Sequence, residues 1–134
     1  MDTPTLAAFI VTRSIPLADG LEALLRAIPR IDEVKVVKTI KDAYEQIERE
    51  TPRIVLVDQV LTGNQTEESL EKIVLLSPET QRVLLVDDIQ DVRWMPQFAE
   101  AVLVKGVSPS AVAAIVTSLL FSKGDGHEHN DPDP

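Results

Sequence analysis

Residues 54–58, Ile-Val-Leu-Val-Asp, decide the fold of this chain. Four consecutive aliphatic residues predict a strand that is buried on both faces, which is typical of a parallel sheet covered by helices on either side. The run ends in a carboxylate, Asp58, and open α/β sheets place their functional sites at the carboxyl ends of parallel strands. This stretch therefore predicts both the kind of sheet and the edge at which the function lies.

Two further apolar runs end in polar residues in the same way. Residues 7–11 are followed by Thr12 and Arg13, and residues 101–104 are followed by Lys105. Because parallel strands end at one edge of a sheet, we expect a guanidinium, an ammonium and the carboxylate of the central run to share one crevice.

Strand-like and helix-like segments alternate along the whole chain. Apolar runs predict five strands, at residues 6–12, 34–38, 54–58, 82–86 and 101–105. Apolar residues at helical spacing predict helices between and after them, at 16–28, 40–50, from Thr66, at 89–98 and from Ser108. The stretch 61–65 has turn chemistry. Five β/α units in sequence predict one α/β domain built on a parallel sheet with right-handed crossovers.

Composition narrows the classes of function. The 134 residues fit a single domain, and 44% hydrophobic with only 4% aromatic residues predict an aliphatic core. A net charge of −9 argues against direct nucleic-acid binding by this domain, and no apolar run is long enough for a membrane span. No cysteine is present and the amino-terminal residues do not form a secretory signal, so we expect a cytoplasmic protein.

The character of the chain changes near residue 122. Residues 124–134 contain no apolar side chain and cannot contribute to a core. We therefore expect a folded domain over residues 1–121 and a disordered acidic tail, or the start of a linker, over residues 122–134.

Two strand ends and the residues after them form a recognisable pattern. Asp58 is followed by Leu-Thr-Gly at 61–63, and Lys105 precedes Ser-Pro at 108–109. Over residues 6–121 the chain resembles the receiver domain of two-component response regulators, closest to the subgroup that precedes a helix-turn-helix output domain. The resemblance implies a flavodoxin-like, doubly wound sheet with strand order 2-1-3-4-5 and a role in phosphorelay signalling and transcription regulation. It does not imply an enzyme.

The resemblance also assigns site positions. Receiver domains hold Mg²⁺ with two acids after the first strand and with the Asp after the third, which accepts the phosphoryl group. Asp58 stands at this phospho-acceptor position and Lys105 at that of the phosphate-binding lysine. Thr12 and Arg13 stand at the acidic pair, and Asp87 stands at the position of a Thr or Ser. The last three residues depart from the family pattern.

Two further features concern partners. Val102 stands where the family often has a switchable Tyr or Phe. Pro96 makes the expected helix at 89–98 short or irregular, and it carries a cluster formed by Trp94, Met95 and Phe98. This cluster either caps the core or forms an exposed patch for a protein partner or a second copy of the chain.

The departures change the expected chemistry. Mg²⁺ prefers oxygen ligands in octahedral geometry, and a hydroxyl with a guanidinium is a poor substitute for two carboxylates. An ionised Asp87 cannot donate a hydrogen bond to a phosphoryl oxygen and repels it. We therefore expect no cofactor and a closed ion cluster of Asp58 and Asp87 with Arg13 and Lys105. A solvated Arg13 is the simpler alternative.

Three functions remain open at this stage. The favoured one is an atypical pseudo-receiver that signals through a protein partner or a homodimer. The first alternative is a working receiver that is phosphorylated on Asp58. In it, Asp88, which adjoins Asp87, would serve as a second Mg²⁺ ligand in addition to Asp58. The second alternative is a flavodoxin-like binder of a small ligand in the same crevice.

Overall fold

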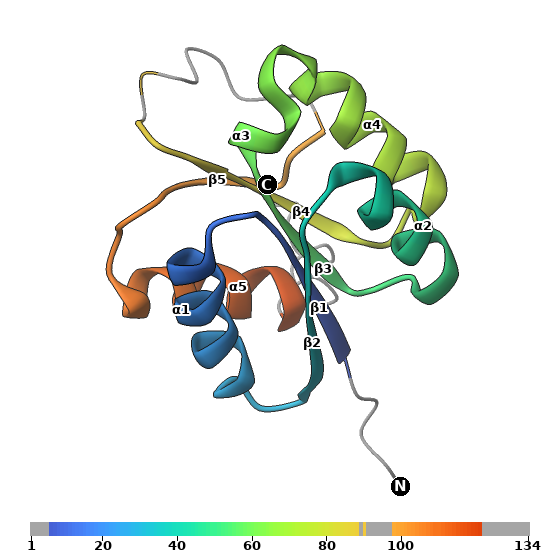
Figure 1. The fold of residues 1–134 in the computed structure, drawn as a ribbon. Helices are drawn as coiled ribbons and strands as arrows, with labels where there is room; N and C mark the ends of the chain where they lie inside the picture. The colour runs from blue at the N-terminus through green and yellow to red at the C-terminus, as the bar shows by residue number, and fades with distance from the viewer. Residues whose placement is uncertain (1–5, 89, 91–97, 122–134) are drawn as a thin grey trace, which may run out of the picture.

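A five-stranded parallel sheet forms the centre of the molecule (Figure 1). The computed structural model describes residues 6–88, 90 and 98–121. The strand order is β2-β1-β3-β4-β5, so the predicted fold class and order are confirmed. The strands are β1 (Leu6–Val11), β2 (Ile31–Val37), β3 (Ile54–Asp58), β4 (Gln81–Val86) and β5 (Ala101–Val104).

Helices cover both faces of the sheet. In chain order the helical segments are α1 (Ile15–Arg26), α2 (Ile40–Glu50), α3 (Gln59–Thr62), the 3₁₀ turn η1 (Gly63–Gln65), α4 (Thr66–Leu76) and α5 (Pro109–Phe121). α1 and α5 lie on one face, and α2 and α4 lie on the other (Figure 1).

Alternate residues of the central strands supply two separate cores. Ile10 and Leu56 point toward α1 and α5, whereas Phe9 and Val55 point toward α2 and α4. Side chains alternate between the faces of a strand, so an uninterrupted aliphatic run serves both layers at once. This explains why β3 is buried along its whole length.

The helix starts follow local capping. The hydroxyl of Ser108 accepts a hydrogen bond from the backbone N–H of Ala111 at 3.2 Å, and Pro109 is the first residue of α5, as the sequence predicts. The hydroxyl of Ser14 accepts from the N–H of Leu17 at 3.3 Å in the same way. Both caps lie at the carboxyl edge of the sheet, where they fix how the chain leaves β1 and β5.

Some element boundaries differ from the sequence prediction. β2 begins three residues earlier than expected because it pairs with the whole of β1, from Leu6 opposite Ile31 onward. The stretch at 61–65 was expected to be a turn, but α3 and η1 occupy it. α3 begins there because the side chain of Asp58 accepts a hydrogen bond from the N–H of Val60 and caps the new helix.

The entry into β5 is tied to β4 by a buried arginine. The Arg82 guanidinium pairs with the Glu100 carboxylate and donates to the carbonyl of Phe98, and the N–H of Arg82 donates to Glu100 at 2.6 Å. Phe98 is half-buried, and its carbonyl is held by the hydrogen bond from Arg82. Trp94 and Met95, the other members of the expected patch, lie outside the described residues, as do most of the expected helix at 89–98 and the segment 122–134.

None of the helices in the described part of the chain is long and apolar enough to cross a lipid bilayer.

We predict that Leu56→Ala lowers the free energy of unfolding by about 2–5 kcal/mol, because it leaves a cavity under α1 and α5 at a fully buried position. Urea unfolding followed by circular dichroism measures the change. Leu75→Ala is the matched control: Leu75 is 74% exposed, so the loss should stay within about 0.5 kcal/mol. Equal losses in the two variants would contradict the packing described above.

Candidate functional site

Four polar residues meet at the carboxyl edge of the sheet. Asp58 is the last residue of β3, and Thr12, Asp87 and Lys105 follow directly after β1, β4 and β5. The backbone N–H of Lys105 donates to the carbonyl of Val86 at 2.8 Å, which continues the pairing of β5 with β4 to the edge. The parallel register therefore delivers all four side chains to one crevice. The sequence predicts Asp58, Asp87 and Lys105 there, whereas Thr12 takes the place expected for Arg13.

Both carboxylate oxygens of Asp58 are engaged. Its Oδ2 accepts a hydrogen bond from the Oγ1 hydroxyl of Thr12 at 2.6 Å. Its Oδ1 accepts from the backbone N–H of Val60 at 3.1 Å and lies 2.5 Å from the ammonium nitrogen of Lys105. A carboxylate that is only 3% exposed thus has its charge matched by one cation and two neutral donors.

Lys105 joins two acids. Its Nζ lies 2.5 Å from Asp58 Oδ1 and 3.0 Å from Asp87 Oδ1. The side chain of Lys105 is 19% exposed and that of Asp87 is 66% exposed. The Asp58 contact is therefore the better shielded of the two, and the Asp87 contact is weakened by water and salt. We call Thr12, Asp58, Asp87 and Lys105 the ion cluster.

The ion cluster shifts both of its buried ionisable groups. Burial raises the pKa of Asp58, but the hydrogen bonds from Lys105, Thr12 and the Val60 N–H outweigh burial, so the pKa lies below its ordinary value of 3.8. Burial lowers the pKa of Lys105, but Asp58 and Asp87 outweigh it, so the pKa lies above 10.5. Asp58 and Lys105 are therefore both charged throughout the neutral range.

Thr12 holds the turn that follows β1. Its hydroxyl donates to Asp58, and the same oxygen accepts from the backbone N–H of Ser14 at 3.1 Å. Thr12 is 1% exposed. One buried hydroxyl thus connects the carboxylate of β3 with the first residue before α1.

Arg13 does not join the ion cluster, which corrects the expected four-charge arrangement. Within the described part of the chain, its exposed side chain forms no ion pair with Asp58 or Asp87. Arg13 instead lines a separate hollow on the β2 side together with Lys38.

The remaining expected positions have local structural roles. Val102 lies half-buried in β5, opposite Leu84 of β4. Asp88 is exposed, and its Oδ1 accepts a hydrogen bond from the N–H of Gln90 at 3.0 Å.

The residues of this site do not fit Mg²⁺. Mg²⁺ is held by carboxylates with near-octahedral oxygen geometry, whereas Asp58 here is paired with the Lys105 ammonium, whose positive charge repels a second cation at the same oxygen. The described residues contain no group of three or more acidic, His or Cys side chains placed to hold a metal ion. The charge of Asp58 is therefore balanced by the ammonium of Lys105, and the site favours this side chain over a bound metal ion.

Sequence reasoning missed two donors to Asp58. The Thr12 hydroxyl was assigned only to a lost metal position, and the N–H of Val60 belongs to a helix that was not expected. A buried Thr at the end of a strand that neighbours a strand ending in Asp is a signal for the first donor. The second donor, the N–H of Val60, depends on how the backbone turns after Asp58. The spacing of apolar residues in the sequence does not predict this turn.

We predict that Asp58→Asn lowers the free energy of unfolding by about 2 kcal/mol near pH 7, because charge-assisted hydrogen bonds are lost. The depressed pKa means that the stabilising contribution of Asp58 is present above the pKa of the unfolded chain, about 3.9, and is lost as pH falls through the folded value. The difference between wild type and variant should therefore shrink near pH 3. Urea unfolding at both pH values measures it.

Asp32→Asn is the control for this experiment. Asp32 is an exposed acid of β2, on the other side of the sheet from Lys105, and its replacement should change stability by less than about 0.5 kcal/mol. A deficit of Asp58→Asn that stays constant with pH would contradict the depressed pKa.

Solved structures of other proteins share this fold. No protein-family model matches the sequence, and no curated protein is significantly similar to it. A CheY-like response regulator receiver domain from Methanospirillum hungatei is 21% identical, with a TM-score of 0.76 over 90% of this chain and 98% of that chain.

Two other structures show the range of proteins that contain the fold. A LuxR-family two-component response regulator from Aurantimonas is 18% identical, with a TM-score of 0.73 over 87% of this chain and 85% of that chain. The pilus assembly protein CpaE from Caulobacter crescentus is 19% identical, with a TM-score of 0.67 over 87% of this chain and 95% of that chain. At these identities the likeness establishes the fold: this chain has the CheY-like receiver fold.

Proposed function

We propose that this chain is an atypical receiver domain that acts in signal transduction and transcription regulation through protein–protein contact, without Mg²⁺-dependent phosphorylation of Asp58. One observation carries the proposal: the Lys105 ammonium contacts both Asp58 and Asp87, while the Thr12 hydroxyl donates to the other oxygen of Asp58. The position that would accept a phosphoryl group is already occupied by contacts within the protein.

The contacts of Asp58 oppose its use as a nucleophile. An attacking carboxylate oxygen needs an accessible lone pair, and phosphoryl transfer needs a cation to neutralise the incoming oxygens. At this site one oxygen is held by Thr12 and the other by Lys105 and a backbone N–H. Asp87 places a negative charge where an incoming phosphoryl group would meet it. The hydrogen bonds to Asp58 weaken it as a nucleophile, and the charge of Asp87 repels the incoming group, so both raise the barrier to transfer.

The ion cluster instead supports a single, permanent arrangement of the edge. Thr12, Asp58, Asp87 and Lys105 each begin or adjoin a different loop, so their contacts hold four loops together without a ligand. Such a domain presents one surface constantly. Its activity would then be regulated by the molecule that binds this surface. The same fold also occurs in a pilus assembly protein, which supports a role for this chain that differs from that of an ordinary response regulator.

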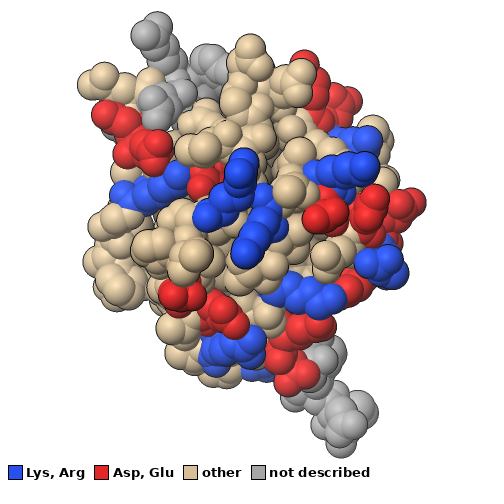
Figure 2. Space-filling model, in the orientation of Figure 1, with Lys and Arg blue, Asp and Glu red and all other residues tan. Residues whose placement is uncertain are grey.

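The surface charge supports a protein partner over nucleic acid. Lysine and arginine side chains are interspersed with acidic ones on the face shown in Figure 2, and several are engaged: Arg26 with Glu22, and Lys35 with Glu50. Phosphate backbones are bound by clustered basic residues, so this mixed surface favours a protein partner.

We also propose that the protein is cytoplasmic.

The partner surface that we favour is β5 with α5, used by a second copy of the chain. β5 is an edge strand, and Val102 and Val104 are only half-buried. α5 contains no charged residue, and Ala111 and Ala114 lie on its exposed face. An uncharged helix beside an apolar strand edge is suited to burial in an interface, whose centre is depleted of charge.

We predict that wild-type protein gains no phosphoryl group from acetyl phosphate with Mg²⁺, as measured by intact-mass spectrometry. The triple variant Thr12→Asp, Arg13→Asp, Asp87→Thr restores the receiver pattern, frees the Asp58 oxygen now held by Thr12, and should gain one phosphoryl group in a Mg²⁺-dependent way. Adding Asp58→Asn to the triple variant should abolish the gain.

Wild-type labelling decides between the proposal and its first alternative. A stoichiometric phosphoryl adduct on wild type that disappears in Asp58→Asn would establish a working receiver and end the proposal. Unlabelled wild type beside a labelled triple variant would locate the block in Thr12, Arg13 and Asp87.

We predict that the wild type is a dimer by light scattering and that Ala114→Arg makes it monomeric, because the variant would bury an unpaired charge in the interface. Asn64→Arg, at an exposed position of η1, adds the same charge elsewhere and should leave the dimer intact. A monomeric wild type would rule out self-association and leave a different protein as the partner.

A further inference from the structure

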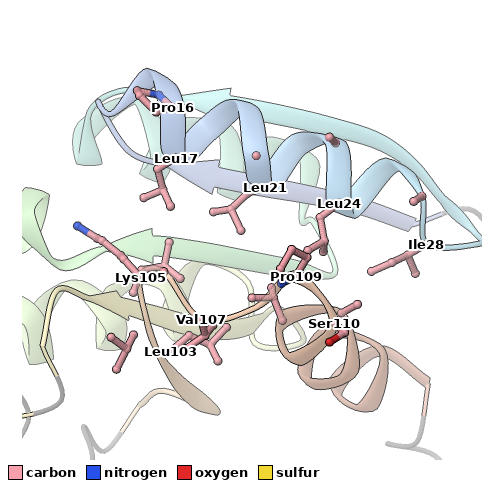
Figure 3. A pocket seen from close by; sticks show the side chains of 18 of the residues that line it. Pro16, Leu17, Leu21, Leu24, Ile28, Leu103, Lys105, Val107, Pro109 and Ser110 are labelled. Atoms are coloured by element: carbon pink, nitrogen blue, oxygen red, sulfur yellow. The ribbon is translucent and has the colours of Figure 1, made fainter.

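An apolar groove with a volume of about 720 Å³ lies between α1 and the segment that joins β5 to α5. Figure 3 shows Leu17 and Leu24 pointing into it from α1, with Val107 and Pro109 on the opposite wall. Lys105 lines one end of the groove, and its nitrogen, which contacts Asp58 and Asp87 of the ion cluster, points away from the groove (Figure 3).

The groove has a closed floor. Leu85 of β4 and Leu103 of β5 line it, and they are only 3% and 8% exposed. The surrounding residues pack against the sheet core at Leu21 and Val112. The hollow is therefore a depression between two secondary-structure elements and does not open into the interior.

Polar chemistry in the groove is sparse. Among the described residues that line it, Lys105 is the one with a charged side chain, and its ammonium is held by Asp58 and Asp87. The hydroxyl of Ser110 is the polar side-chain group on the α5 wall. An ionic ligand would find no uncompensated charge here, whereas a neutral apolar molecule would lose nothing on leaving water.

The dimensions match a small molecule. Sites for small ligands have volumes of roughly 300–1,000 Å³, are mostly apolar and contain few polar groups, and this groove meets all three conditions.

We propose that this groove binds a small, uncharged and largely apolar molecule, with Ser110 as its hydrogen-bonding contact. This site goes beyond the proposed function and does not depend on whether Asp58 is phosphorylated. Lys105, Gly106 and Val107 form part of its wall, so an occupant touches the same turn that carries the cation of the ion cluster. Gly106 has φ +94, a conformation that glycine adopts readily, and this allows the sharp turn at that point.

Gly20 gives a direct way to fill the groove. It lines the groove from the middle of α1, and a Cβ built there meets no atom within 4 Å. Gly20→Phe would place a ring in the hollow without a backbone clash, and it removes a glycine from a helix interior, which favours folding. Gly20→Ala also removes the glycine from the helix, with a larger gain in helix propensity, but leaves most of the volume open.

The test uses the neutral fluorophore N-phenyl-1-naphthylamine and the whole chain. Saturable binding is expected in wild type and in Gly20→Ala, and at least about tenfold weaker binding in Gly20→Phe. Glu71→Phe adds a ring at an exposed site of α4, on the other face of the sheet, and should bind as wild type does. Thermal unfolding of each variant checks that it is folded.

Two-dimensional ¹H–¹⁵N NMR of wild type locates the probe. Amide signals of Gly106 and Val107 should shift on titration, while those of Thr51 and Glu79, at the opposite edge of the sheet, should not. Absence of saturable binding, or equal binding by Gly20→Phe, would overturn the proposal. Dimeric wild type that becomes monomeric in Gly20→Phe, with no probe binding, would also overturn it and assign the groove to a second copy of the chain.

Discussion

The charge of Asp58 is the constraint on which the carboxyl edge of this molecule depends. A carboxylate that is 3% exposed at the end of a central strand would be costly without partners. Its partners come from three places: the Thr12 hydroxyl after β1, the Val60 N–H at the start of α3, and the Lys105 ammonium after β5. Meeting one charge therefore fixes the direction of three chain segments. The strand order makes this possible, because β3 is flanked by β1 and β4, and β5 lies only one strand further away.

On the function proposed above, the same contacts take the place of the metal-dependent switch of a receiver. In a metal-dependent site the neutralising cation is exchangeable, and its arrival with a phosphoryl group changes the loops. Here the cation is covalently part of the chain. The pKa of Asp58 is lowered and that of Lys105 is raised, so protonation does not remove the pair in the neutral range either. On the proposed function, the signal at this edge is a molecule that binds the surface.

The sequence predicts the fold well because buried parallel strands have a strong signature, and β3 and β4 are apolar on both faces. The caps at Ser14 and Ser108 also follow from local chemistry. The site is predicted only in outline. Periodicity places Thr12, Asp58 and Lys105 at one edge, but the side to which Arg13 turns depends on how β1 ends, and α3 exists because Asp58 caps it. The orientation of Arg13 and the start of α3 depend on the path of the backbone just after each strand. Neither the spacing of apolar residues nor the composition of the chain predicts that path.

Lys105 connects the two candidate sites through a single side chain. Its ammonium belongs to the ion cluster, while its residue forms one wall of the apolar groove between α1 and α5. A lysine can divide in this way because its aliphatic stem packs against apolar surface while its charged end reaches polar partners. Gly106 and Val107 extend the same wall. The contact of Lys105 with Asp87 is the more exposed to water of its two contacts and therefore contributes less than the contact with Asp58. The ion pair between Lys105 and Asp87 is thus the weaker of the two. A movement of the groove wall at Lys105 would therefore alter the contact with Asp87 more readily than the contact with Asp58.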